Sequence, residues 1–264
     1  MKKPRPNHRI LDFQNTQNGT YIWIPGWGGN SWTLLPLVES MAKGRHILMD
    51  PLSRKDLESV GLRGRDLSIE LMAESVLKVL ESEEGPWHII GISMGGLVAQ
   101  VLADSLPVEM ATLHLCCTST GGANEQDAVD QSALQAWWRP CVPGEDPITK
   151  ILKCCFSPSF QKDSRFQDYL AHLRKNPSPV SGSTLKLQWQ AALAFDGLPY
   201  LDRVQWPVYI YEGRQDKVVR KEVSRRLERA LRVPPKVEVF SGGHLFFMES
   251  PLEFCKILLR NSAG

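Results

Sequence analysis

This chain lacks long apolar runs and has no large excess of charge of either sign. None of its apolar stretches reaches the roughly 20 residues that a membrane-spanning helix needs, so we expect no membrane association. Its net charge of +2 is too small to favour nucleic-acid binding as the main task. Residues 1–8 are basic, but no apolar run follows them, so no secretory signal is expected.

The six cysteines follow no pattern typical of a metal site or a disulfide framework. No pair has C-x-x-C spacing, and none lies in a turn suited to a catalytic thiol. The sequence therefore predicts no metal ion, no cofactor and reduced cysteines, with a cytoplasmic location as the default. The six cysteines are two adjacent pairs, Cys116-Cys117 and Cys154-Cys155, and two single residues, Cys141 and Cys255.

The remaining composition, 42% hydrophobic and 23% charged over 264 residues, is that of one large globular domain or of a core with an insertion. An amphipathic pattern over residues 68–80 predicts a helix capped by Asp66 or Ser68. Alternation of strand-like and helix-like segments predicts an α/β fold, with a mostly parallel central sheet and helices on both faces. The strand-like segments are 21–24, 46–49, 87–90, 112–116, 208–211 and 237–240.

This alternation breaks down between residues 121 and 193, where the pattern is helical, irregular and rich in proline. We expect residues 1–120 and 194–264 to form the core and residues 121–193 to form an inserted helical cap over the cleft. Aromatic side chains of the cap either line a substrate channel or pack the cap against the core. These residues are Trp137, Trp138, Phe156, Phe160, Tyr169 and Trp189.

The most informative motif is Gly91-Ile92-Ser93-Met94-Gly95, a G-x-S-x-G pattern directly after the apolar segment 87–90. A strand, a sharp turn and a helix at this point would hold the serine in a strained backbone conformation. Small flanking residues allow that conformation and expose the hydroxyl in a cleft. We therefore predict that Ser93 is a nucleophile, although the bare pattern also occurs by chance in Gly-rich loops.

A serine hydroxyl needs a base, and the base needs an orienting partner. His244 follows the strand-like segment 237–240 on a Gly-rich loop, and Asp216 follows the segment 208–211. Glu212 and Asp196 are the alternative carboxylates. Asp216 could also be only the N-cap of a helix over residues 221–230. The chain order Ser93, Asp216, His244 favours the catalytic interpretation.

An oxyanion formed at Ser93 needs backbone donors. The N–H of Met94, the residue after the serine, is one candidate. The backbone N–H of Trp27, in the early loop Pro25-Gly26-Trp27-Gly28-Gly29, is the second candidate. The glycines of that loop would equally serve a tight turn.

Together these motifs resemble the α/β-hydrolase superfamily across nearly the whole chain. The matching segments are Gly26-Trp27-Gly28-Gly29, residues 91–96, Gly213-Arg214-Gln215-Asp216 and Gly243-His244. The resemblance implies the α/β-hydrolase fold, and it is strongest to small esterases and lactonases. Among these are the esterases that cleave the methyl ester of pimeloyl-acyl carrier protein in biotin synthesis. Pro25 departs from the histidine that this family usually has there, but the proposed donor lies two residues later.

The expected activity is cleavage of a carboxylic ester through an acyl-enzyme, with Trp27, Trp138 and Phe156 contacting the substrate. Between residues 150 and 186, seven basic side chains outnumber two acidic ones, so an acyl carrier protein is one possible partner. Lactone opening, thioester cleavage, perhydrolysis or C–C hydrolysis on the same fold stay open, as does a non-catalytic ligand-binding receptor.

Overall fold

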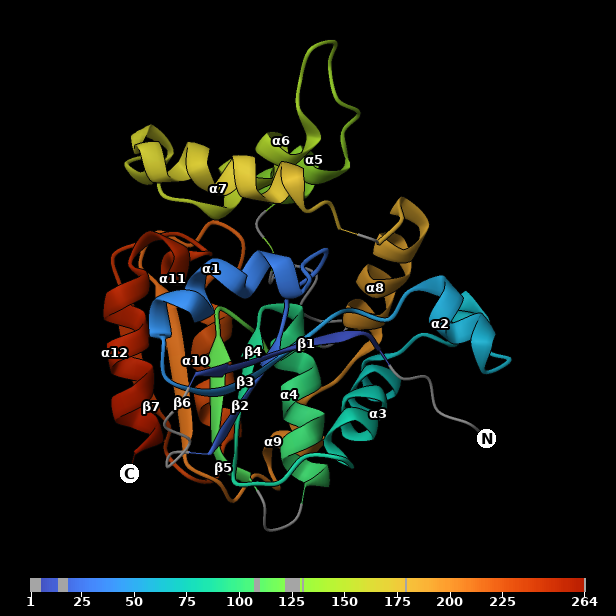
Figure 1. Ribbon diagram of the computed structural model, residues 1–264, viewed down its shortest axis with the longest axis vertical. Coiled ribbons are helices and arrows are strands. Elements are labelled where there is room, and N and C mark those ends of the chain that lie inside the picture. Colours follow the sequence, from blue (N-terminus) through green and yellow to red (C-terminus); the bar gives the residue numbers. More distant parts are fainter. Residues whose placement is uncertain are drawn as a thin grey trace.

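The computed structural model describes residues 6–13, 19–106, 110–121, 129, 131–178 and 180–263. Residues 1–5 of the basic N-terminal segment, and residues 122–128, 130 and 179 of the predicted cap, lie outside the described residues. One seven-stranded sheet, in the order β1-β3-β2-β4-β5-β6-β7, forms the centre of the fold (Figure 1). No helix of the described residues is long and apolar enough to cross a membrane.

The sheet is parallel except at one edge, where β1 runs antiparallel to β3. All six predicted strands are present, and β1 is the one strand of the described residues that the sequence did not predict. Its side chains are half-buried or exposed, so it carries no continuous apolar signal. The strands are β1 (His8–Phe13), β2 (Thr20–Ile24), β3 (Gly44–Met49), β4 (Trp87–Ile92), β5 (Met110–Cys116), β6 (Val208–Gly213) and β7 (Lys236–Phe240).

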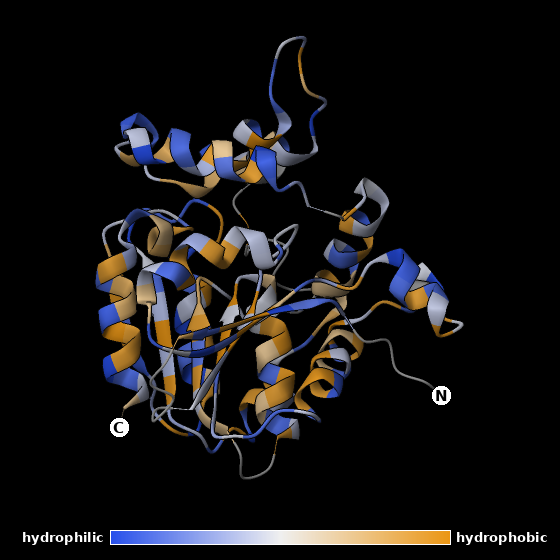
Figure 2. Cartoon of the chain, in the orientation of Figure 1, coloured by the Kyte–Doolittle hydropathy of each residue, from blue (hydrophilic) through white to orange (hydrophobic). Residues whose placement is uncertain are grey.

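Helices cover both faces of the sheet, as predicted, and each face has its own apolar core. One core packs against α3 (Ile69–Leu80), α4 (Met94–Ser105), α9 (Leu198–Leu201) and α10 (Lys221–Ala230). The other packs against α1 (Ser31–Met41), α11 (Phe246–Glu249) and α12 (Pro251–Ser262). A short helix, α2 (Arg54–Ser59), and a 3₁₀ turn, η1 (Gly64–Asp66), lie between β3 and α3. Figure 2 shows apolar residues concentrated on the strands and the adjoining helices.

The predicted helix over residues 68–80 is α3, and its N-cap is Ser68. The Ser68 hydroxyl accepts a hydrogen bond from the backbone N–H of Leu71, a donor that would otherwise lack a partner in the first turn. The helix after Ser93 is α4, which runs to Ser105.

Between β5 and α9 the described residues form four helices and a 3₁₀ turn, which we call the cap helices. They are α5 (Gln131–Trp138), α6 (Pro147–Cys155), η3 (Phe160–Lys162), α7 (Ser164–Lys175) and α8 (Gly182–Ala194). In Figure 1, α5, α6 and α7 lie above the sheet, whereas α8 descends toward α3. α6 and α7 enclose a small apolar cluster of their own, which includes Phe156, Phe160 and Phe166.

His46 belongs to a row of buried histidine and aromatic rings across the strands. Its Nδ1 accepts a hydrogen bond from Trp23 Nε1 at 3.0 Å, and its Nε2 lies 2.6 Å from the backbone carbonyl of Lys43. Because a carbonyl can only accept, Nε2 carries the proton and the ring is neutral. Burial, which opposes the charged form, lowers the pKa of His46 to about 4.

We expect acid to destabilise the fold through this residue. Between its ordinary pKa of 6.5 and about 4, the unfolded chain binds a proton that folded His46 does not. The free energy of unfolding therefore falls as the pH falls through this window. In the variant His46→Gln residue 46 does not titrate, so the free energy of unfolding should change less with pH, by up to about 1 kcal/mol per pH unit. Urea unfolding of both proteins near pH 7 and near pH 5 measures this change. An equal change in both proteins would contradict a neutral, buried His46.

Candidate active site

Ser93 lies between β4 and α4 in a backbone conformation that few residues other than glycine adopt. Its φ is 52° and its ψ is −119°, within the positive-φ region where side chains are strained. The turn expected from the G-x-S-x-G motif is therefore present.

Close packing behind this turn explains its glycines. A Cβ atom on Gly95 would overlap the carbonyl oxygen of Ile24 on β2. A Cβ on Gly91 would lie 2.6 Å from both the carbonyl oxygen of Gly95 and the Cα of Gly96. Larger residues would therefore push α4 away from β2 and β4 and move Ser93.

His244 and Asp216 come from the loops after β7 and β6 and meet in a buried hydrogen bond. The distance from His244 Nδ1 to Asp216 Oδ2 is 2.8 Å, and each side chain is 6% exposed. The second carboxylate oxygen, Oδ1, accepts from the backbone N–H groups of Val218 and Val219. Both oxygens thus have donors, which fixes the carboxylate and the ring that it contacts.

The structure supports neither the other role considered for Asp216 nor the other two carboxylates. The N-cap of α10 is Arg220, so Asp216 does not cap that helix. Glu212 accepts a hydrogen bond from the hydroxyl of Ser224. Asp196 accepts one from the backbone N–H of Leu198.

The charge of Asp216 governs the protonation of His244. Burial by itself lowers the pKa of His244, but the adjacent carboxylate outweighs burial and raises this pKa well above its ordinary value. Cys117 also contacts the ring, and burial raises the pKa of its thiol to about 11, so this neighbour is neutral near pH 7. With Nδ1 donating to Asp216, the neutral ring leaves Nε2 free to accept a proton.

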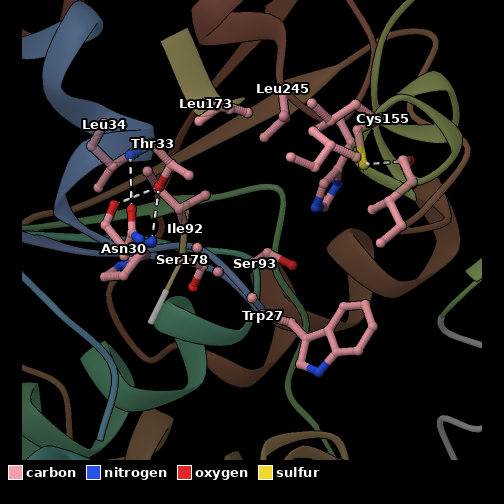
Figure 3. A pocket seen from close by; sticks show the side chains of 18 of the residues that line it. Trp27, Asn30, Thr33, Leu34, Ile92, Ser93, Cys155, Leu173, Ser178 and Leu245 are labelled. Carbon is pink, nitrogen blue, oxygen red and sulfur yellow. Dashed lines mark hydrogen bonds between the residues drawn. The ribbon is translucent and has the colours of Figure 1, made fainter. Parts of the chain in front are cut away.

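Ser93 and His244 line the same cavity, which has a volume of about 310 Å³. Among the described residues no hydrogen bond directly joins their side chains, and such bonds often form only when substrate is bound. Figure 3 shows Ser93 at this cavity, with Trp27, Leu173 and Leu245 around it. Most of the lining is apolar, so the cavity suits an apolar ligand.

The early loop passes directly beside the serine. A Cβ atom on Gly26 would lie 3.1 Å from the Cβ of Ser93 and 3.7 Å from its Oγ. The next residue is Trp27, whose backbone N–H is one expected oxyanion donor. Met94, the other, is the first residue of α4, where a helix has no internal acceptor for the N–H. The loop also forms the tight turn considered as the alternative, through a hydrogen bond from Gly29 N to Gly26 O.

Of the three expected substrate contacts, only Trp27 lines the cavity. Its indole Nε1 donates to the backbone carbonyl of Leu185 on α8 at 2.8 Å. Trp138 is 41% exposed and packs on the ring of Trp27 outside the cavity. Phe156 is 2% exposed and lies among Phe160, Phe166 and Tyr169 inside the cap. Packing of the cap places both side chains away from the space beside Ser93.

One apolar face of the cap that lines the cavity was not predicted from the sequence. Residues Ile148, Ile151, Leu152 and Cys155 of α6 all line the cavity. Their spacing of i, i+3, i+4 and i+7 marks one helical face, and this periodicity was the signal available in the sequence. Leu245, next to His244, lines it too.

The basic residues of the cap are partly used within the protein. Lys150 is buried and donates to the backbone carbonyls of Trp137 and Arg139. Arg165 pairs with Asp163, and Arg174 pairs with Asp146. These contacts reduce the charge available to a partner, and docking of an acyl carrier protein stays a prediction.

The family is shown by comparison with known proteins. Residues 21–257 match the model of the alpha/beta hydrolase family. The chain belongs to this family.

Two curated relatives match most of the chain. It is 22% identical over 263 residues to a monoacylglycerol lipase of Bos taurus, covering 90% of this chain and 73% of the relative. It is 23% identical over 273 residues to a pimeloyl-[acyl-carrier protein] methyl ester esterase of Pseudoalteromonas atlantica, covering 97% of this chain and 99% of the relative. Among solved structures, the enol-lactonase of Burkholderia xenovorans superposes with a TM-score of 0.75 at 18% identity, covering 98% of this chain and 94% of that chain. This likeness shows the shared fold.

We expect Asp216→Asn to lower the pKa of His244, because the raising carboxylate is removed. Activity that needs the neutral ring rises with pH, with a midpoint above 6.5 in the unmodified protein, and this midpoint should move to lower pH. The amide also favours the wrong tautomer, so kcat should fall by about 10⁴-fold. NMR titration of the His244 ring and a pH profile of kcat/KM measure these effects.

Glu212→Gln is the matched control, since Glu212 contacts Ser224 instead of His244. An equal shift in the two variants would show that Asp216 is not the specific partner.

Proposed function

We propose that this protein is a serine hydrolase that cleaves a carboxylic ester through an acyl-enzyme. The observation that carries the proposal is the buried contact between His244 and Asp216, at a cavity that also contains the strained Ser93. Nucleophilic acyl transfer requires a base with a fixed tautomer and a hydroxyl that substrate can reach, and Ser93 lines the cavity.

In the proposed reaction, His244 Nε2 takes the proton of Ser93 as Oγ attacks the ester carbonyl carbon. The backbone N–H groups of Trp27 and Met94 stabilise the oxyanion. When the intermediate collapses, the carbon–oxygen bond to the alcohol breaks, and His244 returns the proton to the departing oxygen. His244 then takes a proton from water, whose oxygen attacks the acyl carbon. The bond from this carbon to Ser93 Oγ breaks and His244 returns the proton to Oγ, which releases the acid and restores Ser93. Asp216 holds the ring and stabilises its charged form throughout.

The relatives support an ester bond as the target more than they support one substrate. Their printed names include a monoacylglycerol lipase, a methyl ester esterase and an enol-lactonase, and each name denotes action on a carboxylic ester or lactone. Their identities of 18–23% are too low to transfer a substrate. The methyl ester of pimeloyl-acyl carrier protein is therefore one candidate among several, and lactones, thioesters and C–C bonds are the alternatives.

We expect Ser93→Ala to lower kcat/KM for p-nitrophenyl acetate by about 10⁴-fold or more, because the attacking oxygen is lost. The wild-type protein should form a fluorophosphonate adduct on Ser93, detected by peptide mass spectrometry, and the variant should form none. Thermal unfolding of both proteins checks that the fold is kept.

Near-normal hydrolysis by a folded Ser93→Ala variant would refute the nucleophile. A wild-type protein that neither reacts with the probe nor turns over any ester would instead favour a ligand-binding receptor.

A further inference from the structure

Two chambers meet at Ser93. The large chamber is the 310 Å³ cavity already described, and the small chamber has a volume of about 80 Å³. Ser93, Trp27 and Trp137 line both chambers. Residues that line only the small chamber include Met94, Leu97, Trp189, Ala192, Val218 and Val219.

Trp27 and Trp137 form the wall between the chambers. Their rings lie 5.2 Å apart, and Trp189 packs on both at 6.0 and 6.3 Å. The bond from Trp27 Nε1 to Leu185 holds the first ring in place. A wall of packed indoles resists rearrangement, so it keeps the two chambers apart.

The position of His244 decides which part of an ester enters which chamber. His244 lines the large chamber and is absent from the described lining of the small one. In the proposed reaction the departing alcohol oxygen must receive its proton from His244 Nε2, so this oxygen lies on the side of the large chamber. The alcohol attached to it therefore extends into the large chamber.

The acyl chain takes the remaining direction. The carbonyl carbon bears the serine oxygen, the oxyanion, the alcohol oxygen and the acyl carbon. Met94, the proposed oxyanion donor, lines the small chamber. With the alcohol on the His244 side, the acyl carbon points past Met94 into the small chamber, which has about a quarter of the volume of the large one.

We propose that this enzyme acts on esters of short acids with large apolar alcohols. The proposal rests on the serine-hydrolase function proposed above and adds the direction in which the ester binds. The aliphatic lining of the large chamber, including Ile151, Leu152 and Leu173, matches an apolar alcohol. A methyl ester of a long acid has the reverse distribution and would have to place its long chain in the small chamber.

A pair of isomeric esters tests the direction. Octyl acetate and methyl nonanoate have the same formula and similar apolar surface, so they differ mainly in the position of the ester bond. The wild-type protein should cleave octyl acetate with a kcat/KM at least about tenfold higher, because excluding even one methylene from a fitted pocket has an effect of this size. Equal values, or a preference for methyl nonanoate, would overturn the proposal.

Two matched variants test which chamber receives the acyl chain and which receives the alcohol, since each puts a leucine into one chamber only. Ala192→Leu reduces the small chamber, so the ratio of kcat/KM for octyl acetate over octyl butanoate should rise about tenfold. Cys155→Leu reduces the large chamber, so this ratio should stay unchanged while the ratio for octyl acetate over ethyl acetate falls. Because each readout is a ratio within one variant, partial misfolding does not imitate it. The opposite pattern would contradict the assignment of the chambers.

The fluorophosphonate adduct on Ser93 distinguishes a wrong direction of ester binding from a wrong proposed function. If the adduct forms and methyl nonanoate is preferred, the direction of binding is wrong and the serine-hydrolase function stands. If no adduct forms and neither isomer is cleaved, the proposed function fails and this assignment fails with it.

Discussion

The hydrogen bond between His244 Nδ1 and Asp216 Oδ2 is the interaction on which the rest of the site depends. It joins two loops, after β6 and β7, in a place from which water is largely excluded, so the attraction is strong and the geometry is fixed. Two backbone N–H groups, from Val218 and Val219, hold the other carboxylate oxygen. Without this support a buried carboxylate would be costly, and the imidazole would have neither a defined tautomer nor a defined direction.

A second constraint is the close approach of backbone segments around Ser93. Gly91 and Gly95 let α4 start directly against β2 and β4, and Gly26 lets the early loop pass within contact distance of the serine. The positive φ of Ser93 is tolerated because the sheet and α4 hold both sides of the turn. Apolar packing on both faces of the sheet thus provides the rigidity that the strained turn at Ser93 requires.

The cap shows where reasoning from sequence reached its limit. Its helical character was predictable, and so was the enrichment in aromatic residues, but the direction of each ring was not. Trp137 and Tyr169 line the cavity, whereas Trp138 packs outside it and Phe156 fills the interior of the cap. Lys150 is one of the seven basic residues between 150 and 186, yet it is buried and donates to the backbone carbonyls of Trp137 and Arg139. Neighbouring residues on a helix face different surroundings, and only packing decides which surroundings those are.

The sequence by itself determined where strands and helices alternate along the chain, the turn at Ser93 and the loops that bear Asp216 and His244. These features follow from local periodicity and from glycine spacing. It did not determine β1, whose half-buried side chains give no clear signal. Only the tertiary structure decided that Asp216, and not Glu212 or Asp196, contacts His244, and that a wall of indoles divides the space at Ser93. Those features arise from contacts between segments far apart in the chain, and no local pattern encodes the distance between two such segments.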